Sequence, residues 1–225
     1  MTNNPKIYLI SGLGADKRAF RKLVFPNEYQ CVYLDWIPML LDDTLESYAE
    51  RLSSTINKAE PFYLIGLSFG GMLATEITKV TNPVRTFLIS SNAVSFELPW
   101  YYKFAGQIKL QKIVPLSLIK TTNSFGLELF GAKTKEEKTL LKQLIFDSDP
   151  KFIKWALNCI LSWRNKTRPS QLIHIHGTAD NILPIKYTKP DYTIEGGSHF
   201  MVYAKAAEIT TIIVTEIINA SNKIT

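Results

Sequence analysis

The sequence has few cysteines and histidines and no long apolar run. Its two cysteines, Cys31 and Cys159, lie in apolar stretches without a CxxC spacing, which predicts two buried free thiols in a reducing, cytoplasmic setting. No segment reaches the roughly 18 apolar residues of a membrane span. Residues 1–6 are short and polar and lack the stages of a secretory signal. Neither a metal nor an organic cofactor is implied by so sparse a set of ligand residues.

The positive charge is concentrated in one part of the chain. The formal net charge is +6, and residues 103–168 hold 13 of the 26 Lys and Arg residues but 5 of the 20 Asp and Glu residues. This segment either forms a solvated face of helices or favours an anionic substrate or carrier. No nucleic-acid-binding motif accompanies the charge, so we expect no nucleic-acid partner.

Short apolar runs alternate with amphipathic segments along most of the chain. This alternation predicts an α/β protein whose mostly parallel central sheet is flanked by helices on both faces. The predicted strands cover residues 6–11, 30–36, 61–67, 83–90, 171–176 and 192–195, and the predicted helices cover 44–59, 70–79 and 204–220.

The region 96–170 interrupts this alternation with helix signals alone. Thr134-Lys135-Glu136-Glu137 fits a capping box, and Asp149-Pro150 fits an N-cap followed by proline at the first helical position. We therefore expect residues 1–95 and 171–225 to form the core, with 96–170 as a helical cap inserted between two strands. Aromatic residues of this cap either cover a dry site or anchor the cap to the sheet: Trp100, Tyr101, Tyr102, Phe104, Phe125, Trp155 and Trp163.

A possible nucleophile lies between a predicted strand and a predicted helix. The pentapeptide Gly66-Leu67-Ser68-Phe69-Gly70 fits the pattern G-x-S-x-G, in which the serine sits on a sharp turn and projects its hydroxyl above the sheet. Glycine is needed at the flanking positions, Gly66 and Gly70, because side chains there would collide with the neighbouring strand and helix. The pattern in this context predicts Ser68 as a nucleophile.

A serine hydroxyl needs a base, and the base needs an acid to orient it. His199, in a loop between the last strand and the last helix, is the best base among three histidines. His174 and His176 lie on a strand and face the same side, which indicates a structural role or, less readily, a metal pair. Asp180 follows the fifth strand and is either the orienting acid or a turn aspartate. Ser68, Asp180 and His199 then occur in the order Ser, Asp, His.

Residues 6–95 and 171–225 resemble an α/β-hydrolase. The resemblance rests on the serine pentapeptide, on H-G-x-x-D-x-x-x-P at 176–184 and on the G-G-S-H loop at 196–199, and residues 11–16 resemble compact bacterial members. It implies an oxyanion hole formed by the N–H groups of Leu13 and Phe69. In some relatives the orienting acid follows the strand that here ends at Ser90. The first carboxylate after Ser90 in this sequence is Glu97. This favours Asp180 as the orienting acid.

These residues together predict a serine hydrolase that cleaves an ester or thioester of a small to medium, largely apolar acyl substrate through an acyl-enzyme. The same triad could instead serve carbon–carbon bond hydrolysis, acyl transfer or lyase chemistry. A non-catalytic binding module on this scaffold is the third alternative. The chain departs from the family pattern at Ser11 and Leu67, where histidines are usual, so relatives do not indicate its substrate.

Overall fold

The computed structural model describes residues 4–107 and 124–222. Its centre is a six-stranded sheet in the order β2-β1-β3-β4-β5-β6. Every pairing of neighbouring strands is parallel, which confirms the predicted architecture. The strands are β1 (Lys6–Ile10), β2 (Gln30–Leu34), β3 (Phe62–Leu67), β4 (Arg85–Ile89), β5 (Leu172–Gly177) and β6 (Tyr192–Ile194).

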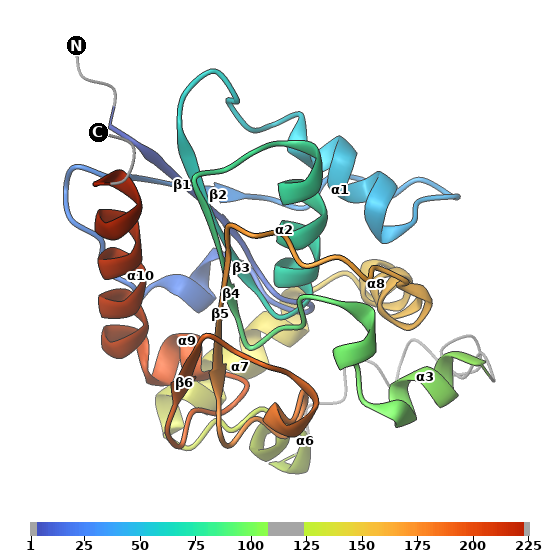
Figure 1. Ribbon diagram of the computed structural model, residues 1–225. Coiled ribbons are helices and arrows are strands. Elements are labelled where there is room, and N and C mark those ends of the chain that lie inside the picture. Colours follow the sequence, from blue (N-terminus) through green and yellow to red (C-terminus); the bar gives the residue numbers. More distant parts are fainter. Residues whose placement is uncertain (1–3, 108–123, 223–225) are drawn as a thin grey trace.

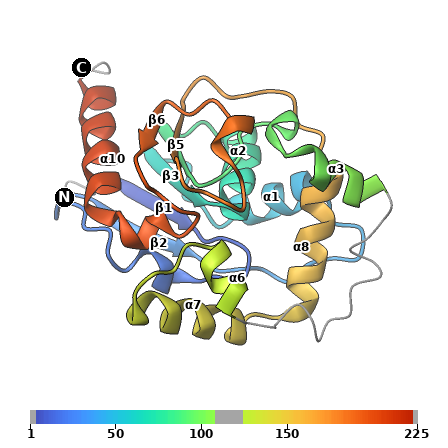
Figure 2. The same cartoon turned by 90° about the horizontal axis from the view of Figure 1, so that it is seen from below.

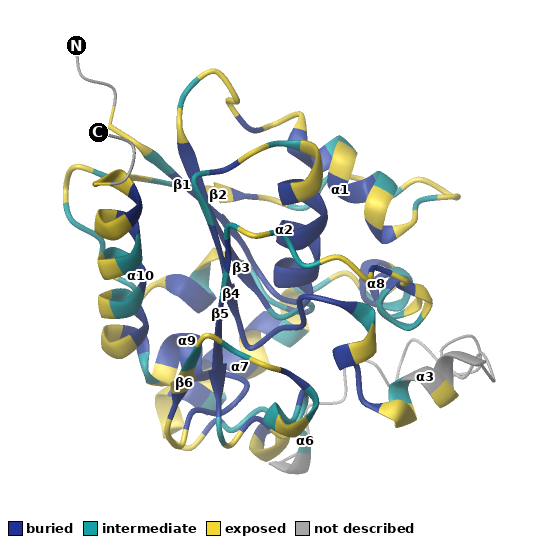
Figure 3. Ribbon diagram, in the orientation of Figure 1, coloured by how far each residue is buried: buried dark blue, intermediate teal, exposed yellow. Residues whose placement is uncertain are grey.

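Helices cover both faces of this sheet, as the apolar strands require (Figures 1 and 2). The residues of β3 are all buried (Figure 3). Buried side chains form one core cluster on each face of the sheet. One face packs against α1 (Leu45–Ser53), α2 (Phe69–Val80) and α8 (Pro150–Ser162). The other face packs against the 3₁₀ helix η1 (Lys17–Phe20), α9 (Met201–Ala204) and α10 (Ala206–Ser221).

Two helices differ from their predicted bounds. The helix α1 begins after Thr44 as predicted but stops at Ser53, because Ser54 and Thr55 bond through their hydroxyls to carbonyls of the preceding turn. The predicted helix over 204–220 corresponds to α10, which begins at Ala206 and ends at Ser221, and the short helix α9, which ends at Ala204, lies almost wholly before the predicted range.

The described residues between β4 and β5 form helices and loops but no strand. The helices are the 3₁₀ helix η2 (Ser95–Glu97), α3 (Trp100–Gln107), α6 (Ser124–Leu129), α7 (Lys135–Asp147) and α8. The predicted caps are present: Glu137 N–H donates to Thr134 Oγ1 at 3.1 Å, and Lys151 N–H donates to Asp149 Oδ1 at 2.8 Å. In Figure 1, α6 and α7 lie beyond the carboxyl ends of the strands. The boundaries of the helical cap at residues 96 and 170 stay a prediction.

The order of the strands creates a topological switch point between β1 and β3. The chain passes from β1 outward to β2 and then returns to β3 on the other side of β1. Loops that leave the carboxyl ends of β1 and β3 therefore run in opposite directions. A crevice forms at such a switch point in parallel sheets, and ligands bind there.

Candidate active site

Ser68 lies at this switch point, in a strained turn between β3 and α2. Its backbone has φ 51° and ψ −119°, a conformation that costs a non-glycine residue about 1–3 kcal/mol. Four hydrogen bonds hold its backbone. Ser68 N–H donates to Ile89 O at 2.9 Å, and Ser68 O accepts from Gly71 N–H at 2.8 Å, from Met72 N–H at 3.3 Å and from Ser91 Oγ at 2.6 Å. The surrounding structure therefore fixes the turn that projects the serine hydroxyl.

The two glycines of the pentapeptide lie where a side chain has no room. A Cβ at Gly66 would lie 2.4 Å from the Gly70 carbonyl oxygen. A Cβ at Gly70 would lie 2.2 Å from the Ser11 carbonyl oxygen at the end of β1. Because both neighbours are backbone atoms, these contacts cannot be relieved by a side-chain rotation. The structure therefore shows, at both glycines, the collisions with the neighbouring strand and helix that the sequence predicted.

The structure brings Ser68, His199 and Asp180 into one hydrogen-bonded row. His199 Nε2 lies 2.9 Å from Ser68 Oγ, and His199 Nδ1 lies 2.8 Å from Asp180 Oδ2. A carboxylate accepts, so Nδ1 carries the proton toward Asp180, and Nε2 is left to accept from the serine hydroxyl. Both Asp180 and His199 are buried.

The carboxylate of Asp180 is held in its ionised form. Its Oδ1 atom accepts from the N–H groups of Ile182 at 2.9 Å and Leu183 at 2.8 Å. Burial works to raise the pKa of Asp180, but the charge and hydrogen bond of His199, with the Leu183 N–H bond, hold that pKa below its ordinary value. Asp180 also shapes its own turn through these two bonds, in line with the turn interpretation, and its role as the orienting acid stays a prediction.

Leu13 and Phe69, the two residues implied as oxyanion-hole donors, lie beside the serine. Leu13 belongs to the loop after β1, where a Cβ on Gly12 would lie 3.2 Å from Ser68 Cβ. Phe69 is the first residue of α2, so its N–H stands at the positive end of the helix dipole. Within the described ranges, neither N–H donates to a backbone or side-chain acceptor.

A cavity of about 280 Å³ opens at Ser68 and is lined almost entirely by apolar side chains. Among the described residues, no Asp, Glu, Lys or Arg side chain lines it. Its walls come from the loops after β1, β3 and β5 and from the helices between β4 and β5. The lining residues are Leu13, Gly14, Ser68, Phe69, Met72, Tyr102, Gly126, Leu127, Phe130, Ile145, Ile153, Leu157, Ile160, Ile182, Leu183 and His199.

Two tryptophans of the expected cap do not line this cavity but bond α8 and its C-terminal end to the loop before α1 and to α2. Trp155 Nε1–H donates to the Asp43 carbonyl oxygen at 3.0 Å. Trp163 Nε1–H donates to Glu76 Oε1 at 2.8 Å, within the buried core.

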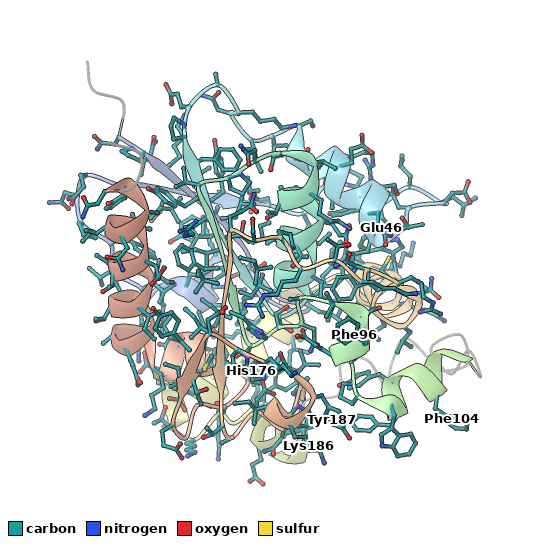
Figure 4. All side chains as sticks on the ribbon, viewed as in Figure 1. Glu46, Phe96, Phe104, His176, Lys186 and Tyr187 are labelled. Carbon is teal, nitrogen blue, oxygen red and sulfur yellow. The ribbon has the colours of Figure 1, made fainter. Side chains whose placement is uncertain are left out.

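The other aromatic residues of the cap divide between the cavity and the surface. Tyr102 lines the cavity. Trp100 and Phe104 are 66% and 55% exposed, and Figure 4 shows Phe104 at the outer edge of the molecule. The side chain of Phe125 lies outside the described residues. The apolar wall is therefore largely aliphatic, which differs from the aromatic cover that the sequence suggested.

Both cysteines are free thiols, as predicted, but only Cys159 is buried, whereas Cys31 is half-buried. Burial raises the pKa of Cys159 to about 12, so this thiol is unreactive.

No group of three or more His, Cys, Asp or Glu side chains in the described part of the chain is arranged to hold a metal ion. No helix in that part is long and apolar enough to cross a membrane.

Sequence reasoning missed two residues that support the row. Ser91 contacts the serine turn through Ser68 O, as given above. The ring of Phe130 packs edge-on against His199, with ring centroids 5.6 Å apart. Neither residue belongs to a recognisable motif, and both act through contacts between segments distant in the sequence.

Comparisons with known proteins give a structural likeness only. No family model matches the sequence, and no curated protein sequence matches it. MenH from S. aureus superposes with a TM-score of 0.73 at 16% identity, over 98% of this chain and 96% of that one. The esterase EaEST from Exiguobacterium antarcticum gives 0.72 at 17% identity, over 96% and 92%. A thermophilic esterase from Thermogutta terrifontis gives 0.71 at 14% identity, over 96% and 90%.

Proposed function

We propose that this protein, which has the α/β-hydrolase fold, is a serine hydrolase that cleaves esters or thioesters of small to medium, uncharged acyl groups. One observation carries the proposal: the hydrogen-bonded row Ser68–His199–Asp180 opens into an apolar cavity of about 280 Å³. Known ligand cavities span about 300–1,000 Å³, so this volume suits a small substrate.

The reaction begins at the Ser68 hydroxyl. His199 Nε2 removes its proton as Oγ attacks the acyl carbon, and Asp180 stabilises the imidazolium that forms. The carbonyl oxygen becomes an oxyanion, for which Leu13 N–H and Phe69 N–H are the proposed donors. The carbon–oxygen or carbon–sulfur bond to the leaving group then breaks, and the imidazolium returns its proton to that group.

A water molecule completes the cycle. The water oxygen attacks the acyl carbon of the Ser68 ester while His199 takes a proton from the water. A second oxyanion forms at the same donors and collapses, Oγ leaves with the proton from His199, and the carboxylic acid is released. The serine is thereby regenerated, and the proposed reaction uses no cofactor.

The cavity lining limits the acyl group. Each methylene buried against apolar walls contributes about 0.8 kcal/mol, or about fourfold in kcat/KM, until the cavity is full. No cationic side chain among the described lining residues would pair with a carboxylate or phosphate. The basic segment therefore gives no support for an anionic carrier or for a lyase with an acidic substrate.

The test is esterase activity with matched variants. We expect a fluorophosphonate probe to label the wild-type protein and not Ser68→Ala, and p-nitrophenyl esters of graded acyl length to show an optimum at short to medium chains. Absence of labelling and of turnover across esters and thioesters would leave the binding-module alternative in place. Product analysis with an added alcohol distinguishes hydrolysis from acyl transfer.

A further inference from the structure

Behind Asp180, two fully buried histidines form a chain of hydrogen bonds. His174 and His176 lie on β5, and His174 Nε2 is 3.1 Å from His176 Nδ1. The other nitrogen of His176, Nε2, lies 2.7 Å from the Leu183 carbonyl oxygen. The other nitrogen of His174, Nδ1, lies 3.2 Å from Thr188 Oγ1. Figure 4 shows His176 within the interior of the molecule.

The partners of these rings determine where their protons are. A carbonyl oxygen can only accept, so His176 Nε2 carries a proton and donates it to Leu183 O. Burial lowers the pKa of both His174 and His176, which keeps both rings neutral at pH 7. His176 Nδ1 therefore accepts from His174 Nε2–H. His174 Nδ1 contacts the Thr188 hydroxyl, which also contacts the Glu97 carboxylate. The two rings form a directed chain that ends at Leu183 O.

Leu183 connects this chain to the acid of the row. Its N–H donates to Asp180 Oδ1 at 2.8 Å, while its carbonyl oxygen accepts from His176. His176 Nε2 also lies 3.5 Å from Asp180 Oδ2, the oxygen that accepts from His199. The imidazole of His176 therefore bonds to one end of the turn that presents the carboxylate and lies beside the carboxylate itself.

We propose that His176 is a positioning residue for Asp180 and that His174 fixes the tautomer in which His176 acts. This inference rests on the proposed function, because it assigns the pair a role in orienting the base. The alternative of a metal pair fails on the same contacts: all four ring nitrogens have protein partners.

The kinetic test compares two substitutions of one residue. In His176→Leu the donor to Leu183 is lost, and we expect kcat to fall about 10- to 100-fold with KM within threefold, as for a small misplacement of a catalytic group. The acid limb of the kcat/KM profile should move to lower pH, because a displaced Asp180 stabilises the His199 imidazolium less. His176→Gln keeps an N–H at a similar reach and should recover most of kcat.

Thr78→Val is the matched control for destabilisation. It removes a buried hydrogen bond to Thr86, ten positions along α2 from Ser68, and should lower the melting temperature with kcat and the pH profile unchanged. If His176→Leu behaves as Thr78→Val does, or if glutamine fails to restore activity that leucine removes, the positioning role is wrong.

A spectroscopic test does not depend on turnover. The chain has three histidines, so ¹⁵N-histidine labelling reports on each of them. At pH 7.5 we expect His174 and His176 as Nε2–H tautomers and His199 as the Nδ1–H tautomer, with a downfield Nδ1 proton. An Nδ1–H tautomer at His176, or an unchanged His199 proton in His176→Leu, overturns the inference. Wild-type inactivity toward every ester and toward the fluorophosphonate would instead reject the proposed function.

Discussion

The hydroxyl of Ser91 donates a 2.6 Å hydrogen bond to the carbonyl oxygen of Ser68, and so connects the end of β4 to the turn that bears the nucleophile. The same carbonyl accepts from Gly71 N–H at the start of α2. The strained backbone of Ser68 is thus held from two directions.

We expect Ser91→Ala to lower both stability and activity. Loss of one buried hydrogen bond costs about 1 kcal/mol in the free energy of unfolding, and the loosened turn should lower kcat about tenfold. Urea denaturation and p-nitrophenyl ester turnover measure the two effects. Ser54→Ala removes a comparable but exposed hydroxyl bond to Arg51 and should change neither quantity. If Ser91→Ala and Ser54→Ala had the same stability and the same turnover, Ser91 would not support the serine turn.

Ser68→Gly should be more stable than the wild type while being inactive. Glycine adopts φ 51° without the side-chain penalty, which for serine is about 1–3 kcal/mol, although part of this gain is offset by the greater freedom of glycine in the unfolded chain. Thermal unfolding should show a raised midpoint for Ser68→Gly. Ser68→Ala is the comparison, because it is equally inactive but keeps the strain. A glycine variant no more stable than the alanine variant would show that the turn stores no strain.

Gly70→Ala should prevent folding of the site, whereas Gly196→Ala should be tolerated. The added Cβ at Gly70 meets two backbone oxygens, those of Ser11 at 2.2 Å and Ile10 at 2.4 Å. Gly196 has φ 65° but no atom within 4 Å of an added Cβ, so its alanine costs only the backbone penalty of about 1–2 kcal/mol. Soluble yield, circular dichroism and fluorophosphonate labelling distinguish the two variants. Full labelling of Gly70→Ala would contradict the close approach of these backbones.

Stability should fall as the pH drops below about 6.5, the ordinary pKa of histidine. The folded pKa values of His174 and His176 are both lowered by burial, so between those values and 6.5 the unfolded chain binds more protons than the folded one. The free energy of unfolding then decreases with falling pH by about 1.4 kcal/mol per pH unit for each histidine.

The charges around the pair modify this slope without reversing it. Burial lowers the pKa of His176 and outweighs the Asp180 carboxylate and the Leu183 carbonyl, which raise it. Burial also lowers the pKa of His174, and His176 and Arg168 lower it further. Asp180 itself, with a lowered pKa, adds to the loss only near pH 4 and below. Urea denaturation at pH 7.5, 6.5, 5.8 and 5.0 measures the slope, which should flatten in the double variant His174→Gln/His176→Gln. An unchanged slope in that variant would assign the acid sensitivity to other groups.

The elements that follow local rules were predictable from the sequence. Strand positions came from short apolar runs, and the starts of α7 and α8 came from Thr134 and Asp149, whose caps depend on residues three or fewer positions away. The serine turn and the order of Ser68, Asp180 and His199 could likewise be read from motifs. The convergence of those three side chains is a property of the parallel sheet, whose carboxyl ends meet at one edge.

Contacts between distant segments could not be read in this way. Nothing adjacent to Ser91 in the sequence indicates that its hydroxyl meets Ser68, and the direction of the His174–His176 chain depends on Leu183 across a turn. The division of cap residues between anchors and cavity lining was also open, because periodicity shows that a helix is apolar but not which neighbour each face meets.

The helix α8 illustrates this limit of sequence periodicity most directly, because it is apolar on two sides. Phe152, Ala156 and Trp163 belong to the core shared with α1 and α2, whereas Ile153, Leu157 and Ile160 face the cavity at Ser68. A substitution that shifts this helix to improve its fit in the core also moves one wall of the space for substrate. Under the proposed function, mutations along α8 selected for thermal tolerance should therefore also alter the preference for acyl-chain length.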